Sequence, residues 1–136
     1  KKSKQVLVEG YRLASGYHLD LIQNYKSSGD NFKWERVYQE YRQLNNYYSK
    51  IQRCPACLKL VNPTIYQAEL QDAASLAAQN RFEIGKAALG DSTIDSGREA
   101  FRHFNTAVGY DQNLPDIVHA KVIPKAKSKR IKKPFG

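Results

Sequence analysis

The sequence predicts an all-α protein, in which antiparallel helical hairpins stack as a short array of about five helices. Two observations support this prediction. Apolar residues recur at helical spacing along most of the chain, and no stretch shows a strong strand pattern. In addition, residues 65–110 combine a helix that has two apolar stripes with a second helix whose packing face holds small residues. A helix with two apolar stripes is expected to contact two neighbours.

The first hairpin is predicted over residues 5–27 and 32–53. Apolar side chains at steps of three, four and seven mark its first helix, and the turn at 27–31 offers Asp30 or Asn31 as the next N-cap. The apolar face of its second helix is rich in aromatic rings, which suit a half-buried groove. The candidates for partner contact are Trp34, Tyr38, Tyr41 and Tyr48. The favoured alternative is that these rings simply pack the hairpin.

The central helix is predicted over residues 63–89, with Asn62 as N-cap and Pro63 at the first helical position. One stripe contains Tyr66, Leu70, Ala73, Ala77, Ile84 and Ala88, and the other contains Ala74, Ala78, Phe82, Gly85 and Leu89. Gly90 is expected to end this helix.

The chain is expected to continue with a helix that begins at a capping box formed by Ser96 and Glu99 and ends near Gly109. A shorter fifth helix is predicted from Leu114 to Pro124. We therefore expect one helical-repeat domain over residues 5–126 and a basic tail or linker over 127–136.

The net charge of +9 lies at the two ends of the chain. Residues 121–136 hold seven cations and no acid, and residues 1–4 add three lysines. Subtracting these ten cations leaves residues 5–120 with a net charge of −1. The helical body therefore lacks the basic face of a nucleic-acid-binding domain. The tail is the only candidate for binding nucleic acid or a ribosome.

The segment Cys54-Pro-Ala-Cys57 is the only candidate for chemistry. A thioredoxin-like dithiol needs a strand before the motif, and here a helix precedes it. A zinc site usually needs four ligands, and no histidine lies near this pair. The two cysteines are either a local disulfide, in an oxidising compartment, or two buried thiols.

The three histidines are expected to be structural rather than catalytic. His18 lies on the apolar stripe of the first helix, and a metal or catalytic role is the minor alternative because no second ligand lies one turn away. His103 and His119 are expected at the surface or at a core boundary. We expect no enzymatic activity, metal or cofactor.

The residues Gly85, Ala100, Phe104, Ala107 and Pro115 resemble the helix-turn-helix signature of tetratricopeptide repeats. Gly85 and Ala100 are three residues farther apart than in that family. The segments WERVYQEYRQLNNYY and GREAFRHFNTAVGYDQNLPD are also similar to envelope lipoproteins of Bacteroidota that carry such repeats.

The resemblance implies a lipoprotein subunit of an outer-membrane complex, which faces the periplasm and is anchored through an acylated cysteine upstream of Lys1. The triplet Asp91-Ser92-Thr93 resembles the O-glycosylation sequon of periplasmic Bacteroidota proteins, which makes Ser92 the candidate acceptor. The function that we expect is a scaffold that holds protein partners. The alternatives are a nucleic-acid- or ribosome-associated protein that binds through its tail, and a thiol–disulfide protein that uses Cys54 and Cys57.

Overall fold

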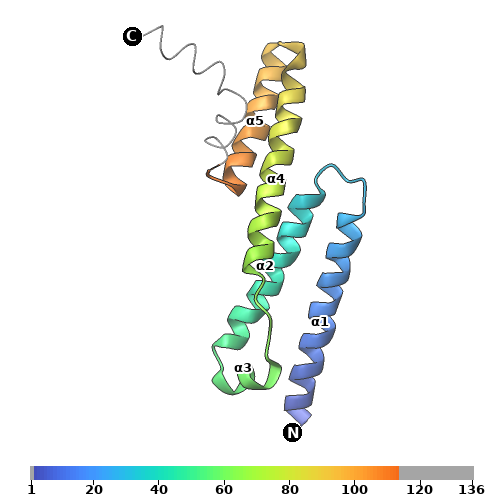
Figure 1. Cartoon of the computed structure of the whole chain (residues 1–136), viewed down its shortest axis with the longest axis vertical. Helices are drawn as coiled ribbons and strands as arrows, with labels where there is room; N and C mark the ends of the chain where they lie inside the picture. Colours follow the sequence, from blue (N-terminus) through green and yellow to red (C-terminus); the bar gives the residue numbers. More distant parts are fainter. Residues whose placement is uncertain (1, 114–136) are drawn as a thin grey trace, which may run out of the picture. The chain divides into compact units, whose positions relative to one another are not determined.

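The computed structural model describes residues 2–113 and confirms the all-α class (Figure 1). Its helices are α1 (Lys2–Lys26), α2 (Lys33–Gln52), α3 (Pro55–Val61), α4 (Gln67–Ala88) and α5 (Ile94–Tyr110), with a short 3-10 turn η1 (Leu89–Asp91) after α4. No strand occurs within these described residues. The fifth helix predicted after Leu114 and the basic tail lie outside them.

The chain divides into two compact units, residues 1–77 and 78–136, whereas the sequence predicts one domain over 5–126. The boundary falls inside α4. Each unit has its own apolar cluster, and each contains one end of α4.

In the first unit, α1 and α2 form the predicted antiparallel hairpin (Figure 1). Its core consists of Ile22, Val37, Tyr41, Leu44 and Ala73. The turn is held by Asp30, whose carboxylate accepts from the Phe32 N–H at 2.8 Å and from Arg36. These two donors hold the pKa of Asp30 below its ordinary value, the Phe32 N–H having the larger effect. Asp30 shapes the turn, but the N-cap position itself is Phe32.

The helix α3 corrects the predicted start of the central helix. Pro55 stands at the first turn of α3, and Asn62 ends that helix in a left-handed conformation, with φ of 51°. Asparagine tolerates this conformation better than most residues, and a proline commonly follows such a cap. The prediction of Asn62 as an N-cap for a helix over 63–89 was therefore wrong, because α4 begins only at Gln67.

The segment between α3 and α4 is held by side chains of the first hairpin. Asn45 of α2 accepts from the Tyr66 N–H at 2.7 Å and donates to the Tyr66 carbonyl at 3.2 Å. The Tyr11 hydroxyl of α1 accepts from the Thr64 N–H at 3.2 Å. These bonds satisfy the N–H groups of Thr64 and Tyr66, which have no helical partner, and give a second donor to the Tyr66 carbonyl, which also accepts from the Leu70 N–H at 3.1 Å.

In the second unit, the end of α4 packs closely against α5. Ala78 and Ala107 are fully buried, Ala100 is 1 % exposed, and the Phe82 and Phe104 ring centroids lie 5.2 Å apart. A Cβ atom placed on Gly85 would lie only 2.7 Å from Cε1 of Phe104. The glycine and the alanines thus permit the close approach that the small-residue pattern indicates.

The ends of these helices differ from the prediction. The chain continues past Gly90 in η1, and Ser92 rather than Gly90 ends it in a left-handed conformation, with φ of 54°. The capping box of α5 is formed by Thr93 and Ser96, so the predicted box of Ser96 with Glu99 was wrong. Thr93 supplies the hydroxyl one turn earlier, which starts the helix at Ile94.

Within the described residues, no helix is both long enough and apolar enough to cross a membrane.

Candidate functional site

The four predicted partner-binding rings lie along α2, and three of them belong to the core of the first unit or pack against it. Trp34 and Tyr38 are half-buried against the core of the first unit, and Tyr48 is also half-buried. Tyr41 is only 7 % exposed, and its ring centroid lies 5.5 Å from that of Tyr66. In this conformation Tyr41 offers almost no surface to a partner. Partner contact through the other three stays a prediction.

His18 joins the two helices of the first hairpin. Its Nδ1 lies 2.5 Å from Oε1 of Glu40, and its Nε2 lies 3.0 Å from the Tyr47 hydroxyl. A carboxylate oxygen can only accept, so Nδ1 donates to Glu40. His18 is thus the core or boundary residue that the sequence predicts, with both nitrogens partnered. Within the described residues, no group of three His, Cys, Asp or Glu side chains could hold a metal.

His103 is buried, with 6 % of its surface exposed, which corrects the prediction of a surface or boundary residue. Its Nδ1 lies 2.9 Å from Nη1 of Arg81, and its Nε2 lies 3.1 Å from Oε2 of Glu99. Because a guanidinium can only donate, Nδ1 accepts and Nε2–H donates to the carboxylate. The His103 hydrogen bond, followed by the charge of Arg102, holds the pKa of Glu99 below its ordinary value.

The outer face of α5 carries a stripe of exposed apolar side chains, which we call the α5 stripe. It consists of Ile94, Phe101 and Val108, which are 78 %, 68 % and 37 % exposed. Residues seven apart lie nearly on one line of a helix, and the buried Ala100, His103 and Ala107 lie on a different face. The α5 stripe was not predicted, although its seven-residue spacing is visible in the sequence.

A similar stripe occurs on α1, in the first unit. Val6, Leu13 and Tyr17 are 70 %, 58 % and 62 % exposed, and their spacing of seven and four residues places them on one helix face. Large apolar side chains exposed singly are ordinary, but aligned sets of this kind mark surfaces that associate with something else. The first and last helices of the described residues, α1 and α5, thus each carry an exposed apolar face.

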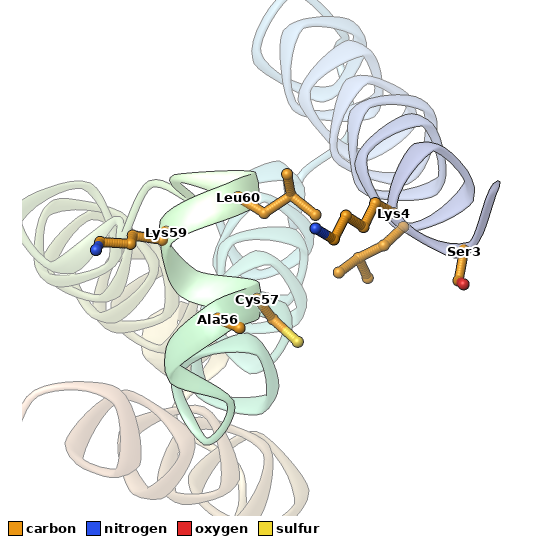
Figure 2. Close-up of a pocket in the computed structure, with 7 residues that line it drawn as sticks. Ser3, Lys4, Ala56, Cys57, Lys59 and Leu60 are labelled. Carbon is orange, nitrogen blue, oxygen red and sulfur yellow. The ribbon is translucent and has the colours of Figure 1, made fainter. Parts of the chain in front are cut away.

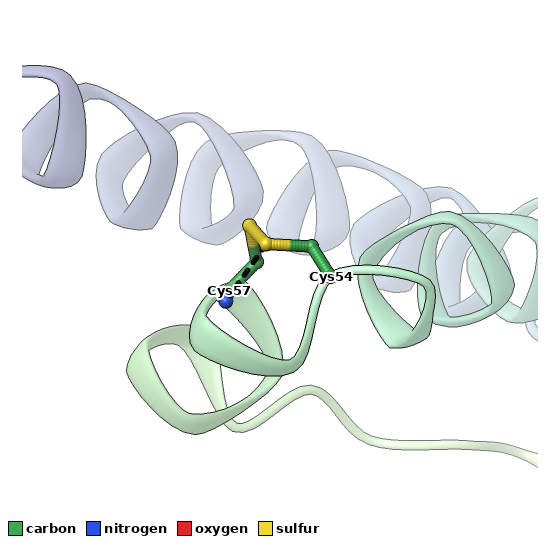
Figure 3. Close-up of a disulfide and its surroundings, with 2 residues drawn as sticks. All are labelled: Cys54 and Cys57. Atoms are coloured by element: carbon green, nitrogen blue, oxygen red, sulfur yellow. Dashed lines mark hydrogen bonds between the residues drawn. A yellow bond between two sulfur atoms is a disulfide. The ribbon is translucent and has the colours of Figure 1, made fainter.

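The structure joins Cys54 and Cys57 in a disulfide at the start of α3 (Figure 3). Cys54 is the N-cap residue, and its sulfur accepts from the Cys57 N–H at 3.1 Å. Both cysteines are half-buried. The bonded form is one of the two alternatives that the sequence leaves open.

We expect replacement of both cysteines by serine to lower the free energy of unfolding by about 1–2 kcal/mol, because the closed loop is only four residues long. Urea unfolding of the wild type and of the double variant, each with and without a thiol reductant, measures this difference. The reductant should shift the wild type toward the variant and leave the variant unchanged. If the reductant leaves the free energy of unfolding of the wild type unchanged, the thiols are not bridged in solution.

The remaining candidate residues are not brought together with any of these features. Ser92 is exposed at the end of η1, a position accessible to modification, and its glycosylation stays a prediction. His119 and the basic tail lie outside the described residues.

Comparison of the chain with protein-family models, with curated proteins and with solved structures finds no match.

Proposed function

We propose that this chain is a non-enzymatic interaction scaffold, a tetratricopeptide-like helical array that binds a partner protein in a cell-envelope assembly. The observation that supports the proposal most directly is the α5 stripe, whose central residue, Phe101, is 68 % exposed. A phenylalanine left in water along a row of apolar side chains favours burial against a second apolar surface.

The repeat-like character of the array is supported by the packing of α4 on α5. In a stack of hairpins, small residues allow each helix to approach its neighbour, and Gly85 faces the Phe104 ring in this way. A short stack buries its ends only when further repeats or another chain cover them. The stripes on α1 and α5 are the surfaces that we expect to be covered.

The envelope location is supported by the disulfide between Cys54 and Cys57, because such bonds persist in secreted and periplasmic proteins and are rare in the cytosol. With the resemblance to Bacteroidota lipoproteins, we propose a lipid-anchored subunit on the periplasmic side of the outer membrane.

Affinity purification in mild detergent, from the native source and across a salt series, tests the proposal. We expect a stoichiometric protein partner that stays bound at high salt, since apolar contacts are little weakened by screening. Phe101→Glu should reduce its recovery at least tenfold, by placing a charge in the apolar contact. Gln71→Glu, which adds the same charge at an exposed position of α4, is the matched control and should retain the partner.

Recovery of nucleic acid alone, lost steeply as salt rises, would contradict the scaffold and favour binding through the basic tail. Equal recovery of the partner with Phe101→Glu, Leu13→Glu and Gln71→Glu would exclude both stripes as the surface that binds it.

A further inference from the structure

Two adjoining cavities open along the N-terminal half of α1, and both have Leu7 in their walls. The first, of about 490 Å³, lies between α1 and α3 and includes Lys4, Cys57 and Leu60 (Figure 2). The second, of about 410 Å³, lies between α1 and α2 and includes Val6, Gly10, Ala14, Tyr47 and Ile51. All these residues belong to the first unit. We call the two cavities together the α1 groove.

The walls of the α1 groove are mainly apolar and offer few hydrogen-bonding groups. Val6 and Leu60 are 70 % and 40 % exposed, so apolar surface there is left in water. Gly10 leaves open space, because a Cβ atom on it would meet nothing within 4 Å. The groove therefore suits a ligand body that is apolar and has no polar groups to satisfy along its length.

The charged side chains of the groove are all cationic. Lys4 and Lys59 line the first cavity and Lys50 lines the second, with no acid among the lining residues. None of these lysines forms an ion pair with the described residues. Figure 2 shows the Lys4 ammonium directed toward Leu60 across the gap between α1 and α3, whereas Lys59 extends from the opposite side of α3. Lys4 is thus the cation best placed for a ligand in the first cavity.

We propose that the α1 groove binds a single-chain anionic amphiphile, a fatty acid whose acyl chain lies on the apolar walls and whose carboxylate pairs with Lys4. The Lys4 ammonium pairs with a carboxylate as a point charge, and no arginine lines either cavity to bind an anion through two parallel hydrogen bonds. A partner helix fits less well, because a helix is about 10 Å across and a cavity of 490 Å³ holds little more than one turn of it. The proposal does not depend on the scaffold function.

The test uses cis-parinarate, a fatty acid that fluoresces when its chain leaves water, with the full chain below the micellar concentration of each competitor. We expect an increase in fluorescence that saturates at one probe per chain. Laurate should displace the probe, and dodecyltrimethylammonium should be at least about tenfold weaker, because its cation faces lysines. Stronger displacement by dodecyl phosphate than by laurate would overturn the assignment of a carboxylate head.

Two pairs of variants locate the site. The double variant Lys4→Gln/Lys50→Gln should bind the probe about tenfold more weakly, or weaker still. Its control, Gln5→Glu/Gln52→Glu, lowers the net charge by the same amount at exposed neighbouring positions outside the groove, and it should bind the probe as tightly as the wild type. Gly10→Leu should fill the second cavity and weaken binding. Gly16→Leu is its control, since that glycine also has open space and lies outside the groove.

Circular dichroism establishes that each variant is folded before its binding is compared. Absence of saturable fluorescence with the wild type would overturn the proposal. The proposal would also be overturned if Gly10→Leu and the lysine double variant were both folded and bound the probe as tightly as their controls. Neither result would bear on the α5 stripe, which belongs to the other unit.

Discussion

Gly85→Leu should lower the free energy of unfolding by about 3 kcal/mol, the upper part of the range for overpacking. Even the first added carbon would lie 2.7 and 2.9 Å from two atoms of the Phe104 ring. The ring could turn aside, but the Ala100 carbonyl oxygen, 3.2 Å away, belongs to the backbone of α5 and cannot yield alone. Relief therefore requires α4 and α5 to move apart. Urea unfolding followed by circular dichroism measures the loss.

Gly109→Leu in α5 is the matched control for Gly85→Leu. A Cβ on Gly109 meets nothing within 4 Å, so leucine should raise stability by up to about 1 kcal/mol through helix propensity alone. Adding Phe104→Ala to Gly85→Leu should recover part of the loss, because the new side chain then occupies the space of the ring. Equal effects of leucine at positions 85 and 109 would show that α4 and α5 do not approach closely in solution.

Asn45→Ala should lower the free energy of unfolding by about 1–3 kcal/mol. It removes both hydrogen bonds to the backbone of Tyr66 and leaves the Tyr66 N–H without a partner, while the Tyr66 carbonyl still accepts from the Leu70 N–H. Tyr66 is half-buried against the core, where water replaces these bonds poorly. Burial also raises the pKa of its phenol. Thermal unfolding and amide hydrogen exchange at Tyr66 both report the change.

Asn45→Asp separates the two bonds. A carboxylate keeps the acceptor for the Tyr66 N–H but turns a negative oxygen toward the Tyr66 carbonyl, so we expect a stability between those of the wild type and Asn45→Ala. Asn46→Ala is the control, because that neighbour is exposed and should change stability by less than about 0.5 kcal/mol. Unchanged exchange at Tyr66 in Asn45→Ala would mean that another group holds the start of α4.

The helical hairpins could be predicted because apolar periodicity extends over many residues. One residue that departs from the pattern therefore does not change the predicted helix. The predicted ranges 5–27 and 32–53 differ by only a few residues from α1 and α2. The close approach of α4 and α5 could also be predicted from the sequence. Gly85, Ala100 and Ala107 share only their small size, and small side chains allow two helices to pack closely. In these regions the residues that form the sequence pattern are the same residues that pack together in the structure.

The candidate surfaces could be predicted only in part. The seven-residue spacing of Ile94, Phe101 and Val108 was available in the sequence, but an apolar row can equally face a core, and only the fold leaves this one exposed. His103 shows the reverse case. Nothing local indicates that Arg81, 22 residues away, reaches its ring.

The sequence by itself determined the helical class, the first hairpin and the small-residue contact of the second, because these depend on the repeated placement of apolar and small side chains. Only the tertiary structure decided where α4 and α5 begin, which cap Asn62 forms, and which faces remain exposed. Alternative caps such as Thr93 and Ser96 differ by about 1 kcal/mol or less, so contacts with neighbouring elements choose between them. So small a difference in free energy can be reversed by contacts with residues distant in the chain, and local sequence patterns do not indicate where those residues lie.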